Sequence, residues 1–161
     1  MPDVNPIPEA YPRITPYLCV DGAADAIAFY TDVFGATERM RMGGEPGDPA
    51  DKVGHAELEI GDGVIMLSDE FPDLGILSPP SIGGTPVTIS LYVPDVDATV
   101  EAALARGATL VRPVATQFYG DRSGQVLDPW GHRWSIATHV EDVSADEMER
   151  RASASPGGGE T

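Results

Sequence analysis

The segment from Gln117 to His139, QFYGDRSGQVLDPWGHRWSIATH, concentrates the most chemically capable side chains of this sequence. It holds two arginines that could clamp an anion and two histidines that could bind a metal or transfer protons. It also holds four aromatic residues that could form a cavity wall. The DPWG stretch has the residue types of a tight turn. The segment could therefore bind a metal, grip an anionic substrate or turn a hairpin.

A second chemically capable group lies in HAELEI, residues 55–60. In a strand, His55 and Glu57 would share one face, and the apolar residues between them would take the other. The pair could bind a metal together with His132 or His139, or hydrogen-bond to each other at a sheet edge. It could also perform acid–base chemistry, because histidine titrates nearest neutrality. If the chain is an enzyme, we expect His55 and Glu57 to be its catalytic residues.

Arg122 lies between two glycines that would let the backbone bend sharply and present the guanidinium from a tight loop. One interpretation is an ion pair with Asp121, Asp128 or Glu57. The other is a clamp for a ligand carboxylate or phosphate. Both interpretations stay open from the sequence alone.

The aromatic residues of the same segment have separate expected roles. Phe118 and Tyr119 would form a cavity wall or stack on a ligand ring. Asp128 would cap the turn, Trp134 would be core, and Trp130 at the turn tip could face a partner. The side chains that we expect to contact a small-molecule ligand are Tyr17, Tyr92, Phe118, Tyr119, Arg122 and Arg133.

Composition excludes several classes of function. Acidic residues outnumber basic ones 26 to 10, giving a net charge of -16, so phosphate backbones and anionic lipids would be repelled. For this reason we expect no nucleic-acid partner. We also expect no membrane partner, because no apolar run is long enough to span a bilayer, and no secretory signal is recognisable. A single cysteine, Cys19, fits a reducing cytoplasm and is expected to be an inert, cavity-facing thiol rather than a nucleophile.

The rest of the sequence predicts the elements that would position these residues. Residues 14–20 alternate as a strand does, and residues 22–35 carry apolar side chains at helical spacing. Asp21 is expected to cap the start of this helix and Gly35 its end. Further strands are predicted at 37–42, 55–60 and 64–68, the last two joined by a tight turn.

The same order recurs in the second half of the chain. A strand at 87–93 precedes a helix at 96–107 that Asp95 would cap, and strands at 108–113, 123–127 and 132–138 follow. YLCVDGAADAIAFYTDVFGAT can be laid over SLYVPDVDATVEAALARGAT with one residue deleted. The chain is therefore interpreted as a tandem duplication of a βαβββ module.

Two such modules predict an α+β fold of curved mixed sheets, each with a helix on its outer face. Because strand residues alternate, one set would pack on the helix and the other would line an inward cavity. The predicted boundaries are an extended arm at 1–12, a first module at 13–70, a linker at 71–85, a second module at 86–143, and a short helix with a disordered tail at 144–161.

The duplicated layout and three segments resemble the vicinal oxygen chelate superfamily. The segments are AIAFYTDVFGA, HAELEIGDGVIMLSDE and GDRSGQVLDPWGHRWSIATHVED. Within that superfamily the chain is most similar to the PhnB-like branch of glyoxalase/bleomycin-resistance proteins, over roughly residues 11–143. The resemblance implies a cavity built by two modules, within one chain or across a homodimer.

In enzymes of that superfamily, four inward side chains, most often His and Glu, bind a divalent metal. The matching positions here are Thr15, Met66, Thr88 and Ser135. Neutral hydroxyls are poor ligands for Zn, Ni, Mn or Fe, and a thioether suits only soft metals such as Cu(I). We therefore expect no metal at these positions and no cofactor, and neither glyoxalase I nor extradiol dioxygenase activity.

Three functions are compatible with this pattern. The first is a metal-free protein that binds or sequesters a small molecule, such as a drug or metabolite, in a mixed aromatic and polar cavity. The second is an enzyme of lyase, isomerase or dioxygenase type that uses a displaced metal, or acid–base chemistry through His55 and Glu57 without metal. The third is a regulatory or scaffold subunit that has no cavity of ligand size.

Overall fold

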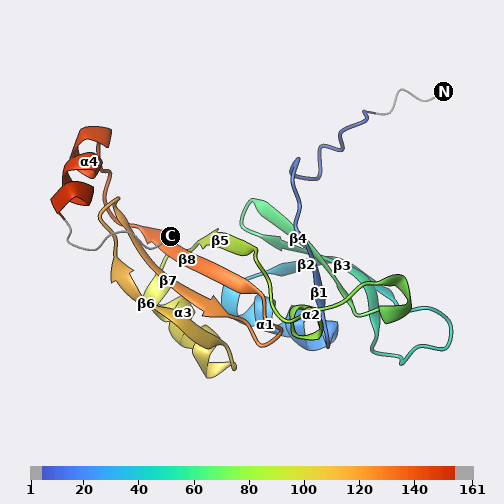
Figure 1. Cartoon of the computed structure of the whole chain (residues 1–161). Coiled ribbons are helices and arrows are strands. Elements are labelled where there is room, and N and C mark those ends of the chain that lie inside the picture. The colour runs from blue at the N-terminus through green and yellow to red at the C-terminus, as the bar shows by residue number, and fades with distance from the viewer. Residues whose placement is uncertain (1–4, 155–161) are drawn as a thin grey trace. The chain divides into compact units, whose positions relative to one another are not determined.

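The computed structural model describes residues 5–154, which form two compact units that divide between Thr85 and Pro86. Each unit contains one mixed four-stranded sheet (Figure 1). The elements of the first unit are β1 Tyr17–Val20, α1 Ala23–Phe34, β2 Thr37–Gly43, β3 Val53–Ile60, β4 Gly63–Asp69, the short helical turn η1 Pro72–Leu74 and α2 Pro79–Ile82. Its strand order is β1-β4-β3-β2, and only β1 and β4 are parallel.

The second unit repeats this topology. Its elements are β5 Thr88–Tyr92, α3 Val96–Ala105, β6 Thr109–Thr116, β7 Asp121–Leu127, β8 Arg133–His139 and α4 Ala145–Ala154. The strand order is β5-β8-β7-β6, with β5 parallel to β8. The predicted α+β class and the repeated βαβββ order are therefore confirmed. Across residues 5–154, none of the helices has the length and apolar character that crossing a membrane requires.

Helix α1 packs its apolar side chains against the first sheet. The residues predicted on one stripe of this helix are all buried: Ala26, Ile27, Tyr30 and Phe34. Phe29 is buried as well, and its ring meets those of Tyr30 and Phe34 edge-on at centroid distances of 5.7 and 5.9 Å. Burying an apolar side chain of this size contributes roughly 1.5–3 kcal/mol. The helix ends at Gly35, which has a φ of 69° and serves as the predicted C-cap.

The cap at the start of α1 differs from the prediction. Asp21 does not cap the helix; the N-cap position is Gly22, which has no side chain to do so. Asp69, at the end of β4, supplies the carboxylate instead. Its Oδ1 accepts hydrogen bonds from the backbone N–H groups of Gly22 and Ala23 at 2.9 and 2.8 Å, and its Oδ2 accepts from Val53 N–H at 2.7 Å. One side chain thus ties the helix start to two strands.

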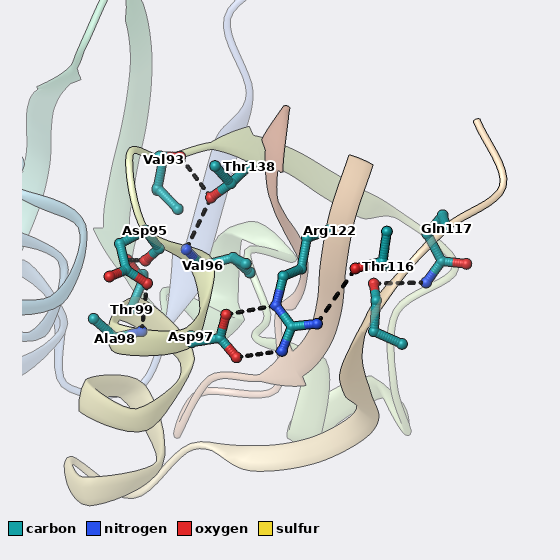
Figure 2. Close-up of polar contacts among 11 residues, drawn as sticks. Val93, Asp95, Val96, Asp97, Ala98, Thr99, Thr116, Gln117, Arg122 and Thr138 are labelled. Atoms are coloured by element: carbon teal, nitrogen blue, oxygen red, sulfur yellow. Dashed lines mark hydrogen bonds and ion pairs between the residues drawn. The ribbon is translucent and has the colours of Figure 1, made fainter. Parts of the chain in front are cut away.

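The start of α3 is held by two side chains. Asp95 is the predicted N-cap and accepts a hydrogen bond from Ala98 N–H at 3.0 Å (Figure 2). Thr138 Oγ1, on β8, accepts from Val96 N–H and donates to the Val93 carbonyl, both at 2.9 Å. The start of α3 is therefore fixed relative to β8.

The DPWG turn between β7 and β8 is built as predicted. Asp128 Oδ1 accepts from Trp130 N–H at 3.0 Å and His132 N–H at 2.9 Å. Its Oδ2 accepts from the indole N–H of Trp134 at 2.9 Å, and this tryptophan is 1% exposed. Asp128 therefore satisfies a buried donor that would be costly to leave unpaired.

Two prolines explain strand boundaries that differ from the prediction. β1 begins at Tyr17 rather than at residue 14, because Pro16 lacks an N–H and only its carbonyl joins the ladder, accepting from Met66 N–H. β6 runs past Pro113 to Thr116, so it ends three residues later than predicted. This is possible because β6 is an edge strand with a register shift between Arg112 and Ala115.

The two glycines around Arg122 play different roles. Gly120 has a φ of 99° and makes the expected bend, since a Cβ there would collide with the Glu141 carbonyl oxygen. Gly124 lies within β7, and the predicted bend is wrong there. A Cβ at Gly124 would come within 2.9 Å of Val114 Cγ2, so this glycine permits close packing instead.

The segments outside the strands are tied down by hydrogen bonds. The described part of the arm, residues 5–12, is not extended throughout, because Tyr11 N–H bonds to the Pro8 carbonyl in a turn. Residues 71–85 group with the first unit, where Glu70 Oε1 accepts from Ser78 N–H, Ser78 Oγ and Ser81 Oγ. The predicted disordered tail beyond α4 falls on residues 155–161, which lie outside the described residues.

We expect the Asp69→Ala variant to be less stable by about 1–2 kcal/mol, because three backbone N–H groups lose their acceptor. Asp21→Ala is the matched control, since this neighbouring carboxylate caps nothing, and it should change stability by less than about 0.5 kcal/mol. Urea unfolding monitored by circular dichroism measures both. Equal losses in the two variants would contradict the capping role of Asp69.

Candidate functional site

A row of four side chains crosses the face of the first sheet that is turned away from α1. Tyr17 on β1 is aligned with Met66 on β4, which is aligned with Glu57 on β3, which is aligned with Met40 on β2. Glu57 therefore lies directly across from Met66. The alternate residue Leu58 is fully buried on the other face. Sheet alternation thus gathers these residues on one open face.

Glu57 is a buried carboxylate at the centre of this row, with 4% of its surface exposed. The Tyr11 hydroxyl, from the arm, donates to both carboxylate oxygens at 2.8 and 3.0 Å. Arg39 on β2 approaches with its Nε 3.9 Å from Oε2, and its guanidinium lies 4.7 Å from the centre of the Tyr11 ring. A buried charge requires such partners to offset its loss of hydration.

His55 connects the buried carboxylate to an exposed hydroxyl. Its Nε2 lies 3.4 Å from Glu57 Oε1, and its Nδ1 lies 2.8 Å from the Tyr17 hydroxyl oxygen. Because an ionised carboxylate only accepts hydrogen bonds, His55 Nε2 must carry the proton that it donates to Glu57. In a neutral ring, His55 Nδ1 then accepts a hydrogen bond from the Tyr17 hydroxyl. Tyr17 is 53% exposed. The chain of contacts can pass a proton between the surface and the buried Glu57.

These contacts lower the pKa of Glu57 below its ordinary value of 4.5. Burial is the largest influence and opposes ionisation, but the hydrogen bonds from Tyr11 and His55 and the Arg39 cation together outweigh it. The expected contact between His55 and Glu57 exists, although not at a sheet edge, because β3 is an interior strand. The sequence analysis did not predict that Tyr11 and Arg39 contact Glu57. Only their residue types, a hydroxyl donor and a cation, made them possible partners for a carboxylate.

The second sheet has a different polar cluster on its open face. Asp121 is 6% exposed and accepts from the Tyr92 hydroxyl at 2.6 Å. His139 donates from Nδ1 to Asp121 at 2.8 Å and from Nε2 to Asp142 at 2.9 Å. The Tyr92 hydrogen bond is the largest cause that lowers the pKa of Asp121, and the hydrogen bond to Asp121 is the largest cause that raises the pKa of His139. Both ring nitrogens of His139 therefore already have a carboxylate partner.

Arg122 is engaged on the helix side of the second sheet. Its Nε and Nη2 donate to the two carboxylate oxygens of Asp97, on α3, at 2.6 and 2.7 Å (Figure 2). Its Nη1 reaches Thr116 Oγ1 at 3.5 Å. The sequence anticipated an ion pair, but the partners it named, Asp121, Asp128 and Glu57, are wrong. Asp97 lies 25 residues away in the chain, so no local pattern reveals this contact.

Arg133 lies at the start of β8, on the open face, since its neighbour Trp134 is buried on the other side. Its Nε is buried and has no hydrogen-bond acceptor among the described residues. Phe118 and Tyr119 form the turn between β6 and β7, with their rings edge-on at 5.2 Å. They are 37% and 39% exposed, so each offers part of a ring to solvent.

Cys19 is not a reactive thiol. Burial is the largest of the causes that raise its pKa from 9.0 to about 11, and the nearby carboxylates of Glu70, Asp69 and Asp21 act in the same direction. A thiol with so high a pKa holds almost no thiolate at neutral pH. This agrees with the inert role expected for Cys19.

The positions that resemble metal-binding positions do not provide a fitting donor set. Thr15 donates its hydroxyl to the Pro12 carbonyl at 3.4 Å, and Thr88 and Ser135 offer only hydroxyls on β5 and β8. Met66 offers a thioether. Within residues 5–154, no three His, Cys, Asp or Glu side chains cluster closely enough to hold a metal ion. Divalent zinc, nickel, manganese or iron would find weak ligands here.

A surface hollow of about 420 Å³ lies beside the arm in the first unit. Its walls come from the arm and from the β3–β4 hairpin: Glu9, Ala10, Tyr11, Pro12, Glu59, Gly61, Asp62 and Val64. The volume falls within the range of small-molecule sites, about 300–1,000 Å³. Tyr11 therefore touches both this hollow and the buried Glu57.

The contact between Tyr11 and Glu57 predicts a measurable change in acid–base behaviour. In Tyr11→Phe the carboxylate loses its strongest donor, so the pKa of Glu57 should rise in a carbon-detected NMR titration. Because a lowered pKa stabilises the fold only while the carboxylate is ionised, the stability gap between the two proteins should be present above pH 4.5. It should shrink as the pH falls through the pKa of folded wild-type Glu57.

Tyr92→Phe is the matched control for this titration, since its hydroxyl bonds to Asp121 instead. It should leave the titration of Glu57 unchanged. An unaltered Glu57 titration in Tyr11→Phe would contradict the hydrogen bond from the arm.

Comparison with known proteins agrees with this fold. A family model described as the Glyoxalase/Bleomycin resistance protein/Dioxygenase superfamily matches residues 12–136. An uncharacterised protein of Mycobacterium bovis is 45% identical over 146 residues, which span 89% of this chain and 93% of that protein.

Solved structures show the same architecture. Protein PA1353 from Pseudomonas aeruginosa aligns with a TM-score of 0.67 at 25% identity, over 81% of this chain and 99% of its own. A PhnB protein from Bacillus cereus shares the fold, with a TM-score of 0.62 at 17% identity over 79% of this chain and 99% of its own. The resemblance drawn from the sequence is thereby confirmed, and the chain belongs to the glyoxalase/bleomycin resistance protein/dioxygenase superfamily.

Proposed function

We propose that this protein binds a small organic molecule on the open faces of its sheets without a divalent metal. The donor set carries this proposal, because Thr15, Met66, Thr88 and Ser135 offer three hydroxyls and one thioether where relatives with a metal would need imidazole or carboxylate. A displaced metal is also disfavoured, since Glu57 already accepts hydrogen bonds from two side chains.

The residues that would contact the ligand are those on the open faces and in the adjoining turn. Tyr17 and Tyr92 each present a half-exposed ring with a hydroxyl already held in place, by His55 and Asp121 respectively. Phe118 and Tyr119 supply partly exposed rings, and Arg133 supplies a charge. Such a mixture of aromatic surface and a few oriented polar groups is typical of ligand sites. Arg122 is not part of this proposal, because Asp97 occupies it.

A second candidate function is acid–base catalysis without metal. The contact chain from Tyr17 through His55 to Glu57 favours it, because a buried ionised carboxylate that orients a histidine is a recurring arrangement for proton transfer. In this case His55 would exchange the proton with Tyr17, and Glu57 would stabilise the charged ring.

The proposal includes a homodimer in the cytoplasm. Exposed apolar side chains on the strands support association, among them Tyr17, Met42 and Tyr92, at 53%, 54% and 65% exposure. The single cysteine supports a reducing compartment. Sedimentation velocity at micromolar concentration should give twice the chain mass of 17.0 kDa.

Ligand binding should be independent of metal. We expect the purified protein to contain far less than one equivalent of any divalent metal by mass spectrometry. In a thermal-shift screen of metals, aldehyde–thiol adducts and aromatic antibiotics, a true ligand should raise the melting temperature equally with and without EDTA. At one hundred times its Kd, such a ligand stabilises a protein by about 2.7 kcal/mol.

The same screen separates the two candidate functions. For a binding protein, the hits should be recovered chemically unchanged by mass spectrometry. Consumption of a hit that stops in His55→Gln but continues in His132→Gln would favour catalysis, since both variants remove one imidazole and only the first interrupts the chain to Glu57. A stoichiometric bound metal that EDTA removes together with binding would contradict the metal-free proposal.

A further inference from the structure

The positive charge of Arg133 is not balanced within the described part of the chain. Three other arginines have carboxylate partners: Arg39 approaches Glu57, Arg122 binds Asp97, and Arg151 binds Glu141. Arg39 also has one buried nitrogen, Nη1, without an acceptor, but its Nε lies 3.9 Å from a carboxylate oxygen. Between residues 5 and 154, no side-chain hydrogen bond or ion pair of Arg133 is found, and its Nε is buried without an acceptor. Buried donors are almost always satisfied, so an orphaned one calls for an explanation such as an absent ion.

The sheet around Arg133 is poor in negative charge. The whole chain has 26 acidic residues, yet the four strands of the second sheet contain one, Asp121. Asp121 accepts hydrogen bonds from Tyr92 and His139. Asp121 is aligned with His139 at the end of β8, whereas Arg133 lies at the start of β8. At about 3.3 Å per residue, the two ends of this strand are roughly 20 Å apart. Asp128, in the adjoining turn, turns its carboxylate to Trp134 on the opposite face.

Apart from Leu127, which is aligned with Arg133 on β7, the neighbours of Arg133 on the open face are neutral or positive hydrogen-bonding residues. Thr88 is aligned directly with Arg133, and Ser135 follows it two residues along β8 on the same face. Gln125 is aligned with Ser135, and Arg112 is aligned with Gln125. Hydroxyl, amide and guanidinium groups can all donate to oxygen atoms. The face therefore offers several donors and no carboxylate near Arg133.

From these observations we propose that Arg133 binds an oxyanion of the ligand, a carboxylate, phosphonate or phosphate, with Thr88, Ser135 and Gln125 as neighbouring donors. This rests on the proposed function and names the class of ligand. The planar guanidinium can donate two parallel hydrogen bonds to such a group, which a point charge cannot do. Two of the four positions that match metal ligands in the superfamily, Thr88 and Ser135, flank Arg133. A fixed organic cation thus takes the place of the metal's positive charge.

The proposal is tested with phenylphosphonate and with benzyl alcohol, its uncharged counterpart, in EDTA-containing buffer at constant ionic strength. The Nε–H resonance of Arg133 is followed by proton–nitrogen NMR, and affinity is measured by calorimetry. We expect a saturable shift of that resonance with phenylphosphonate. Benzyl alcohol should bind at least tenfold more weakly.

Three variants make the test specific. Arg133→Gln should weaken the binding of phenylphosphonate at least tenfold. Arg133→Lys keeps the positive charge but cannot donate two parallel hydrogen bonds, so its affinity should lie between those of Arg133→Gln and the wild type. Arg106→Gln is the matched control, because it removes the same charge from the end of α3, on the helix side of the sheet. It should bind like the wild type. Thermal melts of all variants establish that they are folded.

The inference and the proposed function fail differently. Equal binding by Arg133→Gln and wild type overturns the inference. Binding of benzyl alcohol as tight as that of phenylphosphonate also overturns it, while metal-free binding of a small molecule stands. Binding of phenylphosphonate that requires added Mn²⁺ overturns both.

Discussion

Each sheet buries one face under a helix, and this constraint decides which side chains can meet a ligand. Because side chains alternate along a strand, the burial of Trp134 and Ile136 fixes Arg133 and Ser135 on the open face. Arg122, on the neighbouring strand β7, points to the other face of the sheet, where it binds Asp97 on α3. Two arginines in one short segment thus receive different roles from their position in the pleat.

The two open faces differ in how their charges are balanced. In the first unit the buried carboxylate of Glu57 is surrounded by donors, and these hold its pKa low in spite of its burial. In the second unit the guanidinium of Arg133 has no such partner in the described chain. On the first face Arg39 lies beside the Glu57 carboxylate, although its Nη1 is buried without an acceptor. On the second face, the described residues provide no carboxylate partner for Arg133. This difference is the reason for placing the oxyanion of the proposed ligand on the second sheet.

Much of the fold follows from local sequence patterns. Strand alternation, helical spacing and capping residues such as Gly35 and Asp95 predicted the repeated βαβββ order, because each signal lies within a few residues of the element that it defines. Asp21 failed as a cap because an equivalent acceptor, Asp69, arrives from a strand far along the chain. No propensity could distinguish the two carboxylates without the β1–β4 pairing.

The candidate site was only partly predictable for the same reason. Alternation placed His55 and Glu57 on one face, and their contact required no long-range information. The partners that stabilise the ionised carboxylate of Glu57 come from other segments. Tyr11 is 46 residues away, and Arg39 belongs to the paired strand β2. Asp121 was named only as a partner for the neighbouring arginine, yet it meets Tyr92, 29 residues away. Partners of this kind are set by strand register rather than by residue type.

Whether fixed protein charge has replaced a metal is decided most directly by a crystal structure of the protein grown with both MnCl₂ and phenylphosphonate. Anomalous scattering locates manganese independently of the phosphonate density. We predict phosphonate oxygens within hydrogen-bonding distance of the Arg133 guanidinium and no anomalous peak beside Met66, Thr88 or Ser135. A manganese ion coordinated by any of those side chains, with the phosphonate bound to it, would contradict the account.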